Sequence, residues 1–327
     1  MGLFFANVVV SSWGWAGFLV FIALMLALDL GLFHKKDEAL PFRKAVAWCG
    51  VWVLLAVVFG GLMWAFHGVS AAMTFAAGYA LELALSVDNL FVFLMVFAFF
   101  GVPVALQHRV LFWGILGAVV MRGVFIAGGV ALVEHFSVLM YVFGAFLVFT
   151  GVRMGFSERK DGEKSLGKNV FVRLVRRFFP VASQLHGRRF FVREGGGRLL
   201  VTPLFLALVV IEVSDVIFAV DSIPAVLSVL PPGMDYGLKL FVAFTSNIFA
   251  ILGLRSFYFA LSGLVGLFRF LRVGLAFILV FIGGKMVLAE AGVVHVPVGV
   301  SLGVLAVALF ASVVASVVLP VRPRGGV

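Results

Sequence analysis

The chain has 327 residues, of which 63% are hydrophobic and only 12% are charged, and its net charge at pH 7 is +10. Soluble domains have about 25% charged residues. A soluble fold of this length could not bury so much apolar surface, so the composition excludes a soluble protein. The single cysteine, Cys49, excludes a disulfide scaffold. The class that remains is a helical protein that crosses a lipid bilayer many times.

Apolar segments recur along the chain at lengths that can cross a membrane, which takes about 20 helical residues. They lie at approximately residues 12–33, 45–66, 71–100, 110–133, 137–156, 203–230, 240–262, 273–290 and 297–320. The sequence therefore predicts an all-α polytopic membrane protein with about nine transmembrane helices.

Basic residues are concentrated in alternate connections between these segments. Lys and Arg follow the first, third, fifth and seventh segments and occur again in the C-terminal tail, whereas Lys239 alone lies in a connection on the opposite side. Cytoplasmic loops carry the excess of Lys and Arg. We therefore expect the N-terminus outside and the C-terminus in the cytoplasm. We attribute the basic charge to anionic lipid, and expect no nucleic acid as partner.

The longest connection, residues 157–202, is predicted to be a basic cytoplasmic loop. Its piece VFVRLVRRFF (170–179) has apolar residues on one helical face and arginines on the other. This pattern is typical of an amphipathic helix at the membrane surface, so we expect anionic lipid as a partner of residues 157–198. Residues 188–202 indicate a small β-hairpin that turns on the glycines 195–197.

The chain contains an internal repeat at an offset of 133 residues, or 132 toward its end. LELALSVDNLFVFL (81–94) aligns with SDVIFAVDSIPAVL (214–227). The corresponding polar residues are Glu82 and Asp215, Asp88 and Asp221, Asn89 and Ser222, and Arg122 and Arg255. Each copy contains three spans, and because three is odd the second copy enters from the opposite face. This predicts an inverted repeat, the architecture of many secondary transporters.

On this interpretation the chain has five parts. They are residues 1–70 with two accessory transmembrane helices, 71–156 as the first repeat unit, 157–202 as the basic loop, 203–290 as the second repeat unit, and 291–327 with the ninth helix and a basic tail.

Acidic residues inside the predicted spans indicate a functional site. They are Asp29, Glu82, Asp88, Glu212, Asp215 and Asp221. An acid at the bilayer centre costs about 2.5–3.5 kcal/mol on insertion scales. Inverted symmetry would bring the two central groups together at the midplane. Carboxylate, amide and carbonyl oxygens suit hard cations such as Mg, Ca and Mn, whereas the lack of central histidines disfavours a zinc or copper site.

Asp88 and Asp221 are the predicted direct ligands, because two carboxylates balance a divalent charge. The other predicted metal-site residues are Glu82, Glu212, Asp215, Asn89 and Asn247, with Asp29, Arg122, Arg255, Ser222 and Val220 in supporting roles. Pro224 cannot donate a hydrogen bond to the carbonyl of Val220. This predicts a broken helix in which that carbonyl becomes a further oxygen ligand.

Structural interpretations of the same residues stay open. The pairs Glu82–Arg122 and Asp215–Arg255 could be ion pairs that only stabilise the fold. Asn247 could be an amide that packs helices together. Asp29 could be either a ligand or a helix cap.

At these motifs the sequence resembles the TerC family of integral membrane proteins, in the branch that includes the Alx proteins. The segments that carry the resemblance are ALDLGLFHKK (27–36), LELALSVDNLFVFLMVF (81–97), QHRVLFWGILGAVVMR (107–122), EVSDVIFAVDSIPAVL (212–227) and FTSNIFAILGLRSFYF (244–259). The resemblance implies a bacterial inner-membrane protein that exports manganese. The family is also associated with tellurite resistance and with membrane-protein insertion, so it does not fix one activity.

We therefore expect a divalent-cation exporter, with Mn(II) preferred, that works by alternating access around a midplane site. We expect neither an enzyme nor a prosthetic group, and protons are a candidate for the exchanged ion. Oxygen ligands do not separate Mn(II) from Mg, Ca or Fe(II). The alternatives are a non-transporting scaffold or insertion factor, and an intramembrane aspartyl protease, whose GxGD motif is missing from this sequence.

Overall fold

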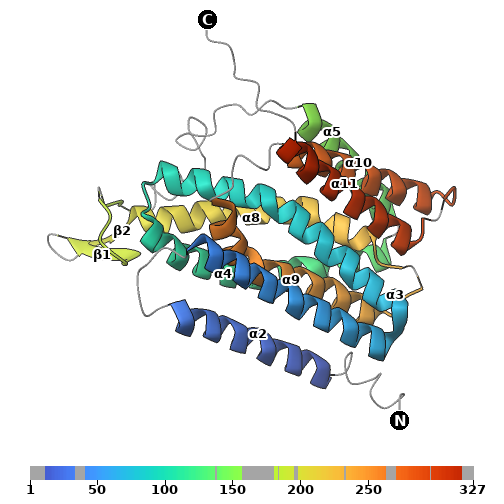
Figure 1. Cartoon of the computed structure of the whole chain (residues 1–327), viewed down its shortest axis with the longest axis horizontal. Helices are drawn as coiled ribbons and strands as arrows, with labels where there is room; N and C mark the ends of the chain where they lie inside the picture. The colour runs from blue at the N-terminus through green and yellow to red at the C-terminus, as the bar shows by residue number, and fades with distance from the viewer. Residues whose placement is uncertain are drawn as a thin grey trace, which may run out of the picture.

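The computed structural model describes residues 12–33, 41–136, 138–156, 180–182, 184–194, 198–231, 233–262, 270–294 and 296–318. They form a bundle of long helices with a two-stranded hairpin at one end (Figure 1). The elements are α2 (Ser12–Phe33), α3 (Phe42–Phe99), α4 (Val104–His135), α5 (Val138–Phe156), β1 (Phe191–Glu194), β2 (Arg198–Val201), α8 (Pro203–Ser228), α9 (Tyr236–Ser262), α10 (Leu271–Glu290) and α11 (Val298–Val318).

Seven helices in the described part of the chain are long and apolar enough to cross a membrane, and α2 contains a shorter apolar stretch, Ser12–Leu28. This confirms the prediction of an all-α polytopic membrane protein. The number of nine spans and the orientation of the termini stay predictions.

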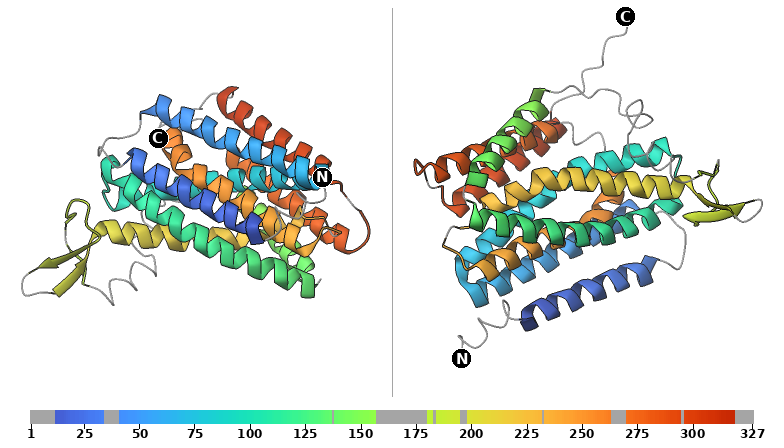
Figure 2. Two further views of the ribbon diagram at one scale, coloured as in Figure 1. Left: turned by 90° about the horizontal axis from the view of Figure 1, so that it is seen from below. Right: turned by 180° about the vertical axis from the view of Figure 1, so that it is seen from behind.

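Helix α3 has 58 residues, nearly three times the roughly 20 that a single membrane crossing needs, so it is long enough for two crossings. Gly68 interrupts it with φ 82° and ψ 177°, a backbone conformation that residues with a Cβ rarely adopt. The chain reverses direction there, so that the two arms run back along each other (Figures 1 and 2). The arms, residues 42–67 and 69–99, correspond to the predicted segments 45–66 and 71–100.

The hairpin lies just before α8. Its strands pair antiparallel, with Phe191 opposite Val201, on either side of residues 195–197, where the sequence predicts a turn. The hydroxyl of Thr202 donates to the carbonyl of Arg189 at 2.8 Å, and the Arg109 guanidinium lies 4.9 Å from the centre of the Phe190 ring. These contacts attach the hairpin to the ends of α8 and α4. The predicted amphipathic helix, residues 170–179, lies outside the described residues.

Helices α5 and α10 pack with their backbones in close contact (Figure 2). A Cβ on Gly283 would lie 2.5 Å from the carbonyl oxygen of Gly144, and a Cβ on Gly151 would lie 2.8 Å from the carbonyl oxygen of Ala276. Small residues allow such an approach between helices in a membrane. Glycine is therefore required at these positions by packing.

We expect Gly283→Ala to lower the free energy of unfolding by about 1–3 kcal/mol, because the added methyl group overlaps with backbone that cannot move away. Gly284→Ala is the matched control, since no atom lies within 4 Å of a Cβ at that position. Thermal unfolding in detergent, followed by circular dichroism, measures both. Equal stability of the two variants would contradict the packing described here.

Candidate functional site

The polar centre of the bundle is organised by Arg122 of α4, which is 1% exposed. Its Nη1 donates to Glu82 of α3. Its Nη2 and Nε donate to the two carboxylate oxygens of Asp215 of α8, at 3.3 and 3.5 Å. One guanidinium therefore joins acids from two different helices, and the group of three keeps one uncompensated negative charge.

Amide and hydroxyl groups complete this network. Asn89 Nδ2 donates to Asp215 Oδ1 at 3.3 Å, Asn247 Nδ2 donates to Glu82 Oε2 at 2.9 Å, and Ser222 Oγ accepts from Arg122 Nη1 at 3.3 Å. Every one of these side chains is buried. The structure thus connects residues that lie far apart in the sequence, on α3, α4, α8 and α9.

Helical spacing explains how these side chains reach a common centre. Glu82 and Asn89 are seven residues apart and share a face of α3. Glu212 and Asp215 are three residues apart on α8. Both face α4, because Asp215 binds Arg122 and a Cβ on Gly117 would overlap with the Glu212 carboxylate. The absence of a side chain at Gly117 makes room for Glu212.

One buried oxygen of the network has no hydrogen-bond partner in the described part of the chain. It is Oδ1 of Asn247, whose amide orientation is set by donation to Glu82, a carboxylate that can only accept. Buried polar atoms in native proteins are nearly always hydrogen-bonded. This acceptor is therefore available to a cation or a water molecule.

A cavity of ≈ 40 Å³ lies beside the network, where the two repeated motifs meet. Its polar wall is formed by Asn89, Arg122 and Ser222, and its remaining wall by Leu85, Met154, Phe218 and Leu279. A water molecule needs about 10–15 Å³ measured in this way, so about three or four waters fit. Sequence reasoning missed Met154 and Gly117, because neither residue type signals a polar site.

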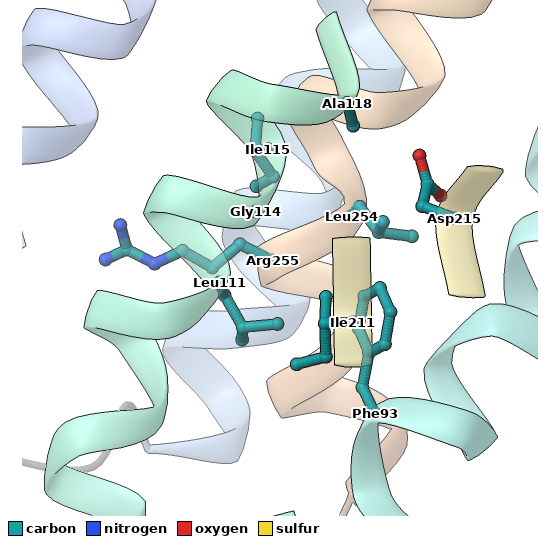
Figure 3. Close-up of a pocket in the computed structure, with 9 residues that line it drawn as sticks. All are labelled: Phe93, Leu111, Gly114, Ile115, Ala118, Ile211, Asp215, Leu254 and Arg255. Carbon is teal, nitrogen blue, oxygen red and sulfur yellow. The ribbon is translucent and has the colours of Figure 1, made fainter. Parts of the chain in front are cut away.

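The pairing of Asp215 differs from the sequence-based expectation. Asp215 binds Arg122, and not the corresponding arginine of its own repeat, Arg255. Both Asp215 and Arg255 line a second cavity of ≈ 10 Å³ with apolar walls, but the Arg255 guanidinium points away from Asp215 (Figure 3). The expected Asp215–Arg255 pair is wrong because the side chain of Arg255 extends away from the Asp215 carboxylate, which Arg122 reaches instead. The expected Glu82–Arg122 pair is present.

The expected break at Pro224 is also wrong. Helix α8 continues through Pro224 to Ser228. The carbonyl of Val220 still lacks a donor at position 224, but the helix does not unwind to offer it as a ligand. In a continuous helix, Asp215 and Asp221 lie about 240° apart around the axis.

The side chains of Asp29, Asp88 and Asp221 lie outside the described residues, so the prediction that Asp88 and Asp221 share an ion is not tested. Among the side chains that are described, no three His, Cys, Asp or Glu are grouped closely enough to hold a metal ion.

Comparison with known proteins finds one matching family and several similar bacterial membrane proteins. Residues 67–323 match the model of the integral membrane protein TerC family. The chain is 46% identical to an uncharacterized membrane protein of Myxococcus xanthus, over 93% of this chain and 92% of that protein. It is 45% identical to a protein of Photorhabdus laumondii (95% and 96% covered) and 44% identical to one of Escherichia coli K12 (89% and 89%). Both of these are named as candidate membrane-bound redox modulators, Alx. No solved structure matches the chain significantly.

Proposed function

The chain belongs to the TerC family of integral membrane proteins, and from that premise we propose that it exports divalent cations, Mn(II) by preference, from the cytoplasm. Transport would proceed by alternating access around the polar centre. In this proposal the chain is not an enzyme and holds no prosthetic group. Its partners are the bilayer, the cation, protons in exchange, and anionic lipid along residues 157–198.

The observation that carries the proposal is the group of acids that the structure gathers in a buried centre. Glu82 and Asp215 share the single positive charge of Arg122, and Glu212 adds a third carboxylate next to Gly117. Charged groups within membrane spans are expensive to bury, and they commonly mark an ion pathway. Together with Asp88 and Asp221, these acids outnumber the buried arginines Arg122 and Arg255 in the sequence of the spans, and such an excess of acids would attract a cation.

The proposed ligands follow from the repeated motifs and from which described oxygens are already held. Glu82 and Asp215 are held by Arg122, so in this state they position the network and do not contact the ion. Asp88 and Asp221 directly precede Asn89 and Ser222 in the chain, both of which line the cavity of ≈ 40 Å³. We assign Asp88 and Asp221 as the direct ligands. A further oxygen ligand would be Oδ1 of Asn247, which has no hydrogen-bond partner in the described part of the chain.

Contacts between α5 and α10 support an inverted repeat. AFLVFTGVRM (145–154) aligns with FILVFIGGKM (277–286), so that Gly151 corresponds to Gly283, and Gly144 to Ala276. Gly151 approaches the carbonyl of Ala276, and Gly283 approaches the carbonyl of Gly144. The same contact is made twice with the roles exchanged, which is what a two-fold axis between two units requires.

One observation favours a second candidate, a non-transporting scaffold or insertion factor. A scaffold would hold its buried acids in ion pairs, and Glu82 and Asp215 are both paired with Arg122. The name of the Alx relatives raises a redox role as well. A dithiol–disulfide couple within the chain needs two cysteines, and the sequence contains only Cys49.

Transport can be tested directly in inverted membrane vesicles that contain a manganese-sensitive dye. We expect Mn(II) entry to depend on the protein and to survive replacement of residues 157–179 by a short Gly-Ser linker. A scaffold that works through its basic loop predicts the reverse: no Mn(II) flux with the complete chain, and loss of its activity when the loop is shortened.

We expect Gly117→Ala to reduce this flux by up to about tenfold while it changes the free energy of unfolding by less than about 1 kcal/mol. The new methyl group displaces only the end of the Glu212 side chain. Gly128→Ala on the same helix is the control, since a Cβ there has no atom within 4 Å. If Gly117→Ala transports as fast as Gly128→Ala, the position of Glu212 does not matter for transport.

A further inference from the structure

We propose that four apolar side chains form a hydrophobic gate, which closes the polar centre off from the end of the bundle where the hairpin lies. The gate residues are Phe93 of α3, Leu111 of α4, Ile211 of α8 and Leu254 of α9. This end of the bundle is the cytoplasmic one on the predicted orientation. The inference therefore rests on the proposed function, and it specifies where the ion enters the protein.

Helical spacing places the gate directly beside the polar centre. On each of the four helices, a polar residue of the network has a gate residue on the same face, nearer to the hairpin end. The pairs, with the polar residue first, are Asn89 and Phe93, Arg122 and Leu111, Asp215 and Ile211, and Asn247 and Leu254. The two members of a pair are four, seven or eleven residues apart, which is close to a whole number of helical turns.

The gate residues are packed closely enough to stop an ion. They are between 2% and 5% exposed and belong to one apolar cluster. Together with Asp215 they line the second cavity, of ≈ 10 Å³, whereas one water molecule needs about 10–15 Å³. Figure 3 shows Phe93, Leu111 and Ile211 grouped at one end of this cavity and Asp215 near the other. Apolar constrictions of this kind block ions because they exclude water.

The aromatic ring of Phe93 is the largest part of this gate. The wall that α4 contributes to the cavity includes the small residues Gly114 and Ala118, so little else fills the space between the ring and Asp215. Arg255 also lines the cavity, but its guanidinium extends away from Asp215 (Figure 3). Removal of the ring should therefore open a route from the hairpin end to the Asp215 carboxylate.

A buried hydrogen bond joins two of the gate helices one turn beyond the gate. The Tyr258 hydroxyl of α9 donates to Gln107 Oε1 of α4 at 2.8 Å, and Gln107 Nε2 donates to the carbonyl of Val102 at 3.0 Å. Tyr258 lies four residues after Leu254, and Gln107 lies four residues before Leu111. This bond holds α4 and α9 together at the level where the gate closes, so we expect it to keep the gate shut.

Thiol labelling tests the gate without any metal ion. The reporter is Ala118→Cys, which lies between the gate and the polar centre, in a complete chain whose native cysteine is removed by Cys49→Ala. The reagent is a charged methanethiosulfonate that does not cross membranes. Inverted and right-side-out vesicles are compared, and labelling of Arg193→Cys, an exposed position of the hairpin, identifies the vesicles in which the hairpin faces the reagent.

We expect labelling of the reporter from the hairpin side to be about tenfold faster or more in Phe93→Ala, because truncation leaves a cavity beside the reporter. Phe75→Ala is the matched control and should leave the rate unchanged. Phe75 is also on α3 and is 2% exposed, against 3% for Phe93, but it belongs to a different apolar cluster.

Tyr258→Phe provides a milder change, which decides the question if Phe93→Ala does not fold. It should speed labelling from the hairpin side by about fivefold, in line with the loss of one buried hydrogen bond. Tyr236→Phe is its control, because Tyr236 lies at the opposite end of α9 and is 44% exposed.

Labelling that stays at the wild-type rate in the folded gate variants, or that rises equally in Phe75→Ala, would overturn the gate. A rise only from the side opposite the hairpin would overturn it as well. The assay is independent of transport. Mn(II) flux with unchanged labelling refutes the gate alone, whereas faster labelling without any Mn(II) flux in the wild type refutes the proposed function and leaves a barrier to water.

Discussion

Replacement of Arg122 by glutamine is expected to lower the free energy of unfolding by about 3–5 kcal/mol, because it leaves two buried carboxylates without a cation. Glu82 and Asp215 are 0% and 4% exposed, so bulk water solvates their carboxylates poorly once the guanidinium is removed. Thermal unfolding of the purified protein in detergent measures the loss. Arg122→Lys should be intermediate, because an ammonium keeps the charge but cannot reproduce the forked contact with Asp215.

Two further variants make this prediction specific. Arg153→Gln changes an exposed arginine at the end of α5 and should alter stability by less than about 0.5 kcal/mol. Adding Glu82→Gln to Arg122→Gln should recover part of the loss, because only one carboxylate is then unpaired. If Arg122→Gln is as stable as Arg153→Gln, the ion-paired centre described here does not hold the helices together.

Neutralisation of either motif aspartate is expected to reduce Mn(II) flux by about 100-fold or more. Changing a residue that only hydrogen-bonds to a metal ligand commonly lowers affinity or activity by about 10–100-fold, and the proposal makes Asp88 and Asp221 direct ligands. Asp88→Asn and Asp221→Asn conserve shape and remove charge, and flux into inverted vesicles measures the effect.

Asp235→Asn is the matched control for these two variants. Asp235 is exposed at the start of α9, where its carboxylate accepts from the backbone N–H of Gly237 at 2.9 Å. Asparagine can make the same hydrogen bond, so flux should not change. Wild-type flux in Asp88→Asn or Asp221→Asn would remove the basis for assigning these residues as ligands.

The helices could be predicted from the sequence because length and composition determine where a chain can cross a bilayer. The segments 45–66 and 71–100 coincide with the two arms of α3, and the hairpin strands flank the glycines where a turn is expected. These features depend on local pattern alone.

The pairing inside the site could be predicted only in part. The repeat indicates which residues correspond, and it led to one arginine for each acid. Which cation reaches which acid depends on how α4 and α9 are rotated about their axes, and Arg122 serves both acids while Arg255 points elsewhere (Figure 3). Uniformly apolar helices give little information about rotation, because every face is hydrophobic.

Expectations drawn from local sequence failed where packing against other helices decides the structure. Pro224 removes a hydrogen bond from α8, yet the neighbouring residues Ile223 and Ala225 are buried in apolar clusters that keep the helix continuous. Met154 and Gly117 belong to residue types that are common in any membrane helix. Their place in the site follows only from what they line or face: a cavity in one case and the Glu212 carboxylate in the other.

The central claim is that residues from both repeats bind one ion together, and equilibrium Mn(II) binding to the purified protein tests it most directly. Electron paramagnetic resonance titration of wild type, Asp88→Asn, Asp221→Asn and the double variant gives affinity and stoichiometry. We expect one ion per chain, and a loss in each single variant nearly as large as in the double variant, because partners in one site are not additive. Unchanged binding in either single variant, or two independent ions that are lost one at a time, would contradict the account.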